Sequence, residues 1–290
     1  MKLLVVGVGG QVARSLVERA RGSSVEVLSI GRPDVDLEIA GGAEQAILSE
    51  APDIVVNSAA YTAVDDAEEE PERAFRINAE AAGEIAGAAA RAQAPIIHLS
   101  TDYVFDGRAS EPYREDAATA PLSVYGRSKL AGEERVRAAN PHHLIIRTSW
   151  VYSPFGRNFV KTMLRLAGEK DEIAIVADQL GSPTSALDIA DAVIGILDRV
   201  KNGASGTFHY AGRGICSWAD VAEQIFAVSR ALGGPNAAVR RISTSDYPTR
   251  AVRPAFSALD SGHFEAEFGI GAREWRNGVA EVVERLIGAS

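Results

Sequence analysis

The stretch "LLVVGVGGQVA", from Leu3 to Ala13, decides the fold of this chain. Its four leading apolar residues predict a buried parallel strand, and three small residues follow, Gly7, Gly10 and Ala13. In a strand-turn-helix unit one glycine allows the tight turn and the next lets a pyrophosphate approach the backbone. A small third residue lets the helix pack closely on the strand. We therefore expect a dinucleotide site over Gly7, Gly10, Gln11 and Val12, with a plain structural turn as the alternative.

The alternation of short apolar runs with helical patterns continues along the chain. We predict strands at 3–6, 25–30, 53–60, 94–100 and 143–152, with helices that include 11–21 and 72–93. Strand-helix-strand repetition is typical of an α/β protein with a Rossmann-like, doubly wound parallel sheet. After residue 152 the alternation of strand and helix patterns becomes less regular. We expect a dinucleotide-binding domain in 1–152 and a smaller C-terminal substrate-binding lobe in 153–290, interleaved with the end of the first domain.

Composition and charge narrow the classes of function. The 290 residues carry a net charge of −9, which opposes binding to the phosphate backbone of nucleic acid. No apolar run is long enough to span a bilayer, so we expect no membrane partner. Cys216 is the only cysteine, which excludes an internal disulfide framework and is typical of a cytoplasmic protein.

Two further segments supply candidate catalytic groups. Thr101 in "STDYVFDG" ends a predicted strand, and ligands of doubly wound folds bind at the carboxyl ends of strands. Tyr125 and Lys129 in "SVYGRSK" are one helical turn apart. A phenol needs a nearby positive charge to exchange a proton near neutral pH, and Lys129 is placed to supply it. The Thr101 hydroxyl would hydrogen-bond the tyrosine and a substrate oxygen. A packed tyrosine beside a solvated lysine is the structural alternative.

These motifs together resemble the extended short-chain dehydrogenase/reductases, and within them the dTDP-4-dehydrorhamnose reductase branch. The resemblance covers essentially the whole chain and includes "VVNSAAYTAVDDAE", "STDYVFDG", "APLSVYGRSKLAGE", "LIIRTSWVY", "NFVKTMLRLA", "DQLGSPTSALDIAD" and "TRAVRPAFSALD". It implies that Thr101, Tyr125 and Lys129 are the catalytic trio. The implied reaction is reduction of dTDP-4-dehydro-6-deoxy-L-mannose to dTDP-L-rhamnose by hydride transfer from NAD(P)H, with Tyr125 as proton donor.

The resemblance also implies binding residues. Those expected at the cofactor, besides Tyr125 and Lys129, are Asn57, Ala59 and Ala60, with Asp36 and Leu37 at the adenine. Those expected at the sugar nucleotide are Thr62, Val64, Tyr103 and Trp150. Arg253 is a candidate for the substrate diphosphate, because an arginine fork suits phosphate oxygens. One departure is Phe256 in "AFSALD", where relatives usually carry asparagine.

Cofactor preference is predicted from the end of the second strand. NAD-specific folds place an acidic residue there, which would repel a 2′-phosphate, whereas this chain has Gly31 and Arg32. We therefore expect NADPH to be preferred, with Arg32 and Ser29 at the phosphate, although many reductases of this family also accept NADH. The alternative is that Arg32 points into water.

A few residues distinguish the alternative functions. A 4,6-dehydratase would need an Asp-Glu pair after the threonine, but here Asp102 and Tyr103 follow. Another NDP-4-keto-6-deoxysugar reductase remains an alternative, as does a non-catalytic relative such as the regulatory subunit of methionine adenosyltransferase. The five histidines lack metal-ligand spacing, so we assign no metal. Some relatives form cation-linked dimers, but Arg14 and Ser15 stand where an acidic ligand is sought, and the expected state is a monomer or a homodimer.

Overall fold

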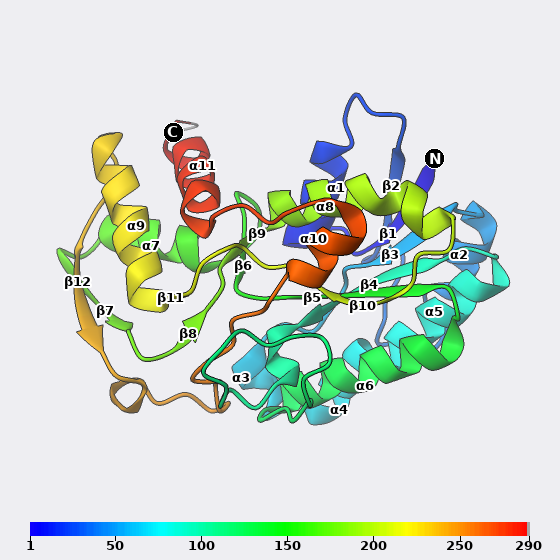
Figure 1. The fold of residues 1–290 in the computed structure, drawn as a ribbon, viewed down its shortest axis with the longest axis horizontal. Helices are drawn as coiled ribbons and strands as arrows, with labels where there is room; N and C mark the ends of the chain where they lie inside the picture. The colour runs from blue at the N-terminus through cyan, green and yellow to red at the C-terminus, as the bar shows by residue number, and fades with distance from the viewer. Residues whose placement is uncertain (289–290) are drawn as a thin grey trace.

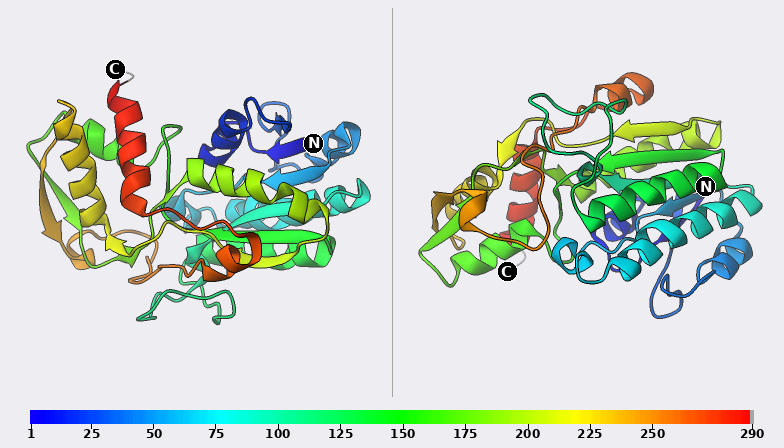
Figure 2. Two further views of the ribbon diagram at one scale, coloured as in Figure 1. Left: turned by 45° about the horizontal axis from the view of Figure 1, so that its top comes forward. Right: turned by 90° about the horizontal axis from the view of Figure 1, so that it is seen from below.

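The computed structural model describes residues 1–288 and divides into a larger lobe around a parallel sheet and a smaller lobe (Figure 1). The further views in Figure 2 show the same separation, with α7 (Phe159–Ala167), α9 (Trp218–Ala231) and α11 (Trp275–Gly288) gathered at one end. Among the helices in residues 1–288, none is both long and apolar enough to cross a membrane.

The sheet has six parallel strands in the spatial order β10-β5-β4-β3-β1-β2. The strands are β1 (Lys2–Val6), β2 (Glu26–Ile30), β3 (Ile54–Asn57), β4 (Ile96–Thr101), β5 (His143–Thr148) and β10 (Gly206–His209). The predicted α/β doubly wound class is confirmed. Because β1 has β2 on one side and β3 on the other, the order of connection reverses there. Doubly wound folds bind their ligands outside the strand ends at such a switch point.

Helices cover both faces of this sheet. The side chains of β1 alternate, so that Leu3 and Val5 pack with α1 (Gln11–Arg19) and α8 (Ala186–Lys201), while Leu4 and Val6 face the other side. That second face is covered by α2 (Glu44–Glu50), α5 (Ala81–Arg91) and α6 (Val124–Ala139). A strand buried on both faces reads as a continuous apolar run, which is why "LLVV" was a sound predictor.

Two predicted elements are divided in the structure. The strand predicted at 143–152 is two strands, β5 and β6 (Val151–Tyr152), because Trp150 between them has a left-handed backbone with φ of 48°. β6 pairs with β9 (Thr184–Ser185) instead of continuing the main ladder. The helix predicted at 72–93 is α4 (Pro71–Phe75), a π-helical turn at Arg76–Glu80 and α5. The segment "GTFHYAG" forms β10, which pairs with β5 in the main sheet, because α8 returns the chain to the larger lobe.

The smaller lobe has its own apolar core. Helices α7, α9 and α11 enclose it with β7 (Glu172–Val176), which pairs with β12 (Ala238–Ile242). Trp275 lies fully buried in this core. A two-stranded pair, β8 (Leu180–Gly181) with β11 (Cys216–Ser217), lies between this core and the sheet lobe in Figure 1. The remaining short elements are α3 (Val64–Ala67), α10 (Gly262–Phe268) and the 3-10 turns Asp102–Val104 and Thr244–Asp246.

Candidate active site

The glycine turn has the shape that a pyrophosphate requires. Gly7 has φ of 122°, and a Cβ there would lie 2.9 Å from the Ser58 hydroxyl, so only glycine fits. Gly10 begins α1 without a side-chain cap, and a Cβ on Gly10 would meet no atom within 4 Å. The backbone N–H groups at this helix start are therefore not occupied by a capping side chain. Ala13 is buried between α1 and the sheet. The residues present fit a dinucleotide.

The candidate catalytic groups meet where β4 ends and α6 begins. Thr101 is the last residue of β4, and Tyr125 and Lys129 lie on one face of α6. A Cβ at Gly126 would lie 2.2 Å from the Tyr103 carbonyl oxygen, so the glycine of "YGRSK" lets α6 approach the strand tip. Ser123 caps the helix by accepting a hydrogen bond from the Gly126 amide at 3.1 Å. All three side chains are buried: Tyr125 is 9% exposed and Lys129 is 2% exposed.

Burial shifts the proton affinities of this cluster. It raises the pKa of Tyr125, and a hydrogen bond with Thr101 lowers that pKa in part. Burial lowers the pKa of Lys129 to about 8, against the charge of Glu133, which raises it. The Lys129 ammonium donates to the Leu99 carbonyl at 2.7 Å. The Lys129 ammonium is thus held against strand β4 one helical turn from Tyr125, and its lowering of the Tyr125 pKa stays a prediction.

A buried network holds this part of α6 against the sheet. Glu133, one turn beyond Lys129, accepts hydrogen bonds from Ser100 at 2.6 Å and from Arg147 at 2.8 and 2.9 Å. Its carboxylate is fully buried, and the Arg147 guanidinium is 4% exposed. The position of Lys129 is therefore set by strands β4 and β5 together with α6.

The predicted residues after β3 line the next strand end. Asn57 is buried, bonds His98 at 3.1 Å, and accepts from the Ala59 amide at 3.2 Å. Ala59 and Ala60 follow with partly exposed side chains, as does Val64 at the start of α3, while Thr62 is exposed. The segment thus runs along the carboxyl edge of the sheet beside the glycine turn, since Val6 and Asn57 pair in register.

Two aromatic pairs include Tyr103 and Trp150, which are predicted to bind the sugar nucleotide. The rings of Tyr103 and Tyr125 meet edge to face with centroids 5.5 Å apart. Trp150 stacks on Trp218 at 3.7 Å with an interplanar angle of 5°. A Cβ at Gly181 would lie 2.5 Å from the Trp150 indole, so the glycine makes room for this ring. The side chain of Trp150, whose backbone is left-handed, thus has contacts from two later segments.

Arg253 lies in the same region but is already paired. It donates to Asp65 at 2.8 Å, and its Nε is buried without a hydrogen-bond partner in residues 1–288. Asp65 also accepts from the Ala251 amide at 3.1 Å. This acid therefore fastens the segment after β12 to α3. Phe256, the departure from the usual asparagine, packs with Phe105 and Tyr113 in a small apolar cluster.

The region expected to bind the 2′-phosphate of the cofactor includes the exposed side chain of Arg32. The Arg32 side chain is 66% exposed and lies 3.7 Å from Glu38. Asp36 accepts from the Glu38 amide at 3.0 Å, and Leu37 packs at the edge of the sheet core. The Ser29 hydroxyl is buried without a partner in the described chain. Gln11 bonds Ser153, Asn158 and the Val151 carbonyl, so its side chain joins α1 to the smaller lobe, and Val12 is buried.

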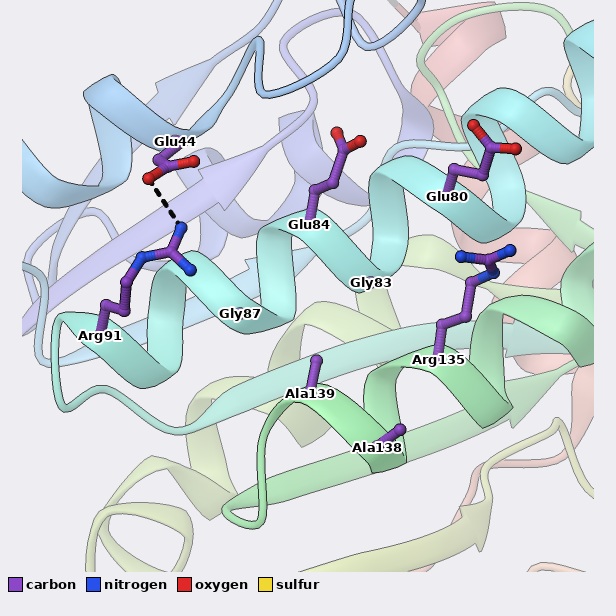
Figure 3. Close-up of a pocket in the computed structure, with 9 residues that line it drawn as sticks. All are labelled: Glu44, Glu80, Gly83, Glu84, Gly87, Arg91, Arg135, Ala138 and Ala139. Atoms are coloured by element: carbon purple, nitrogen blue, oxygen red, sulfur yellow. Dashed lines mark ion pairs between the residues drawn. The ribbon is translucent and has the colours of Figure 1, made fainter.

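A groove on the larger lobe is separate from these residues. It has a volume of about 580 Å³ and lies between α5 and α6 (Figure 3). Arg91 forms an ion pair with Glu44 at 2.8 Å beside it, and Arg135 points toward Glu80. Ala138 on this groove is nearly four turns beyond Tyr125, or about 20 Å along the helix. The groove is therefore not the candidate active site.

Comparisons with known proteins agree with this geometry. Residues 1–287 match the family described as RmlD substrate binding domain. A dTDP-4-dehydrorhamnose reductase of Sinorhizobium fredii is 49% identical over 99% of this chain and 98% of its own length. The chain belongs to the dTDP-4-dehydrorhamnose reductase family.

Solved structures of the same family superpose along the whole chain. That of a dTDP-4-dehydrorhamnose reductase from Clostridium acetobutylicum has a TM-score of 0.92 at 40% identity and covers 99% of both chains. One from Bacillus anthracis in complex with NADP has a TM-score of 0.92 at 32% identity, covering 98% of this chain and 99% of its own.

Several residues that contact the predicted site residues were not predicted from the sequence. Asp102 directly follows Thr101 and was not predicted as a site residue. Trp218 contacts Trp150 from a distant segment, as Ser257 does Asp102, and no local pattern indicates such contacts. For Glu133 a signal existed, because it continues the one-turn spacing from Tyr125 to Lys129.

Proposed function

We propose that this chain reduces dTDP-4-dehydrorhamnose to dTDP-L-rhamnose with NADPH, and with Tyr125 as the proton donor. The observation that carries the proposal is the meeting of Thr101, Tyr125 and Lys129 at the tip of β4, beside the glycine turn. The family membership supports the choice of substrate. The NADP complex of the Bacillus anthracis relative supports the choice of cofactor.

The cofactor would be held by residues from two strand ends and two helices. Gly7, Gly10 and the first amides of α1 suit the pyrophosphate. Asn57, Ala59 and Ala60 would line the nicotinamide side, and Asp36 with Leu37 the adenine. Lys129 would bind the nicotinamide ribose, and Arg32 with Ser29 the 2′-phosphate. When bound, the reduced nicotinamide supplies the hydride for C4 of the keto sugar.

The chain itself supplies the proton and the orientation. Tyr125 donates its phenolic proton to the oxygen at C4, and the positive charge of Lys129 offsets the phenolate that remains. The Thr101 hydroxyl orients the substrate carbonyl. Burial of all three groups removes competing water and strengthens these interactions.

The sugar nucleotide would lie between the two lobes. Thr62, Val64 and Tyr103 approach from the larger lobe, and Trp150 forms an apolar wall braced by Trp218. Arg253 would face the substrate diphosphate, because its buried Nε–H group has no hydrogen-bond partner in residues 1–288 and can donate to a phosphate oxygen. In this assignment residues 153–290 act mainly as the substrate-binding lobe, while α8 and β10 complete the larger lobe.

The expected cellular location and partners of the protein are inferred from its composition. The single cysteine favours a cytoplasmic enzyme, and the negative net charge opposes binding to nucleic acid. The expected state is a monomer or a homodimer. Cys216 is buried, and burial raises the pKa of its thiol to about 12, so it would stay an unreactive thiol.

The decisive experiment follows NADPH absorbance with dTDP-4-dehydrorhamnose and identifies the product by NMR. Turnover to dTDP-L-rhamnose supports the proposal. Faster turnover of a different NDP-4-keto-6-deoxysugar would favour the alternative reductase. Tight NADPH binding by fluorescence titration without turnover of any keto sugar would favour a non-catalytic regulatory relative.

A further inference from the structure

Asp102 is a buried acid beside the catalytic threonine that the proposed reaction does not use. It is the first residue after β4 and opens the 3-10 turn Asp102–Val104. Its residue exposure is 2%. One carboxyl oxygen, Oδ1, accepts the Thr101 hydroxyl proton at 2.9 Å. The Thr101 oxygen also accepts from the Tyr103 amide at 3.2 Å, and Thr101 lowers the pKa of Tyr125 in part.

The second carboxyl oxygen is the unusual feature. Oδ2 of Asp102 is buried without a hydrogen-bond partner among residues 1–288, and Asp102 takes part in no ion pair in that range. Ser257, from the segment after β12, and the Tyr103 amide are the polar groups nearest to favour its charge. A buried carboxylate that is only half satisfied is costly, so its protonated form is close in free energy.

A hydroxyl has one proton, and that restricts Thr101. While Asp102 is ionised, Thr101 donates to Asp102 and only accepts from Tyr125 or a substrate. If Asp102 carries a proton on its carboxyl, it donates to the threonine oxygen instead. The Thr101 proton then points toward Tyr125 and the substrate carbonyl, where reduction needs a donor.

We propose that Asp102 is a positioning residue whose protonation state sets the direction of the hydrogen bonds through Thr101 to Tyr125. The protonated state favours reduction, and the ionised state favours the reverse oxidation. This proposal rests on the proposed function, because it acts through the same threonine and tyrosine. Asp102 itself transfers no proton to the substrate, and Tyr125 remains the donor.

The surroundings make Asp102 the group that titrates near neutral pH. Burial raises its pKa to about 6, and Ser257 and Thr101 oppose this shift because they favour the charged form. The facing titratable groups are Tyr103 on the same turn and Tyr125 on α6, and burial raises the pKa of both phenols. The charged group of the segment after β12 is Arg253, which acts on Tyr103 and is paired with Asp65. The two phenols therefore stay neutral between pH 5 and 8.

The first test is the pH dependence of kcat for reduction. In the wild type kcat should fall roughly tenfold or more from pH 5.5 to 7.5 as Asp102 ionises. Asp102→Asn keeps an oxygen that accepts and an amide that donates, without titrating, so its profile should be flat over that range. The matched control is Asp116→Asn, an exposed acid, which should keep the wild-type profile. A sloping Asp102→Asn profile would overturn the proposal.

The second test does not need turnover. Infrared difference spectra between pH 5 and 8 should contain a carboxylic acid band that is absent in Asp102→Asn and whose titration midpoint shifts in Thr101→Val. If the band titrates unchanged in Thr101→Val, Asp102 is not coupled to the threonine and the proposal is wrong. If the wild type reduces no keto sugar while the band shifts as expected, the proposed function fails and the coupling stands. Melting temperatures identify a variant that has not folded.

Discussion

The candidate catalytic cluster of Thr101, Tyr125 and Lys129 differs from the region around Arg32 in the burial of its side chains. Tyr125 and Lys129 are buried, and each hydrogen-bonds or contacts the strand tip that bears Thr101. The Arg32 side chain is 66% exposed, and its nearest acidic partner, Glu38, is 3.7 Å away. One region is assembled before any ligand binds, whereas the other is an exposed guanidinium on a surface turn.

The buried cluster is suited to proton transfer, whereas the exposed region is suited to the choice between NADPH and NADH. Proton transfer needs groups fixed to fractions of an ångström, which burial and helix packing provide here. Recognition of a 2′-phosphate needs only a mobile positive charge within reach of the surface. Substitutions in the cluster should therefore reduce turnover with either cofactor, while substitutions near Arg32 should change only the preference between them.

The largest effect is expected from Tyr125→Phe. Removal of the proton donor should lower kcat by roughly 10² to 10⁴, with NADPH affinity changed less than about twofold. Steady-state kinetics and fluorescence titration measure the two quantities. Tyr152→Phe is the matched control, because Tyr152 is also buried and donates to the Trp275 carbonyl at 3.2 Å. Near-full activity of Tyr125→Phe would return this tyrosine to a packing role.

Lys129→Met should lower kcat by roughly 10²-fold and also weaken NADPH binding, because the stabilising charge and the ribose contact are lost together. The same substitution tests the burial of Lys129 through the free energy of unfolding. Folding lowers the Lys129 pKa to about 8, so between pH 8 and its ordinary value near ~10.4 the unfolded chain holds more protons. The free energy of unfolding that depends on Lys129 therefore rises with pH across that window.

Urea unfolding at several pH values checks this sign. Lys129→Met should be the more stable protein at pH 7.5, and its advantage over the wild type should shrink toward pH 10. The exposed Lys170, changed to Met, is the control and should show no such trend. A pH-independent difference, with unchanged kinetics, would show that Lys129 is only a solvated neighbour of Tyr125.

The same contrast explains what the sequence could predict. The parallel strands and the glycine turn are local patterns, so "LLVVGVGG" and the Tyr125–Lys129 spacing indicate both the fold and the cluster. The break at Trp150 was not predictable, because its φ of 48° depends on Gly181 and Trp218 from later segments. The half-satisfied carboxyl of Asp102 is equally invisible, since it arises from packing against Ser257. Arg32 was recognised by type, but its exposure depends on the tertiary fold.

Arg32→Ala should act on cofactor preference alone. Loss of a charged hydrogen bond to the 2′-phosphate should lower kcat/KM for NADPH by about 1.5 to 3 kcal/mol, roughly 10- to 150-fold, and leave NADH nearly unchanged. Arg91→Ala is the control, because Arg91 is similarly exposed but lies on the α5 groove. Equal losses with both cofactors would show that Arg32 supports the fold or the shared part of the dinucleotide.

The smallest predicted effect comes from Glu38, and it sharpens the comparison because it concerns only surface charge. Its carboxylate lies 3.7 Å from Arg32 and accepts from Arg73 at 2.8 and 3.1 Å. The negative charge should partly neutralise the site offered to a 2′-phosphate. Glu38→Gln should therefore raise the ratio of kcat/KM for NADPH over NADH by about two- to fivefold, the range of an exposed ion pair. Arg73 keeps its second partner, Glu70, at 3.0 Å, so the neighbouring helix should stay in place. Because exposed charges are screened, the gain should shrink as salt rises from about 0.01 to 1 M. A gain that is independent of salt would mean that Glu38 acts by shape, and no gain would place the 2′-phosphate away from Arg32.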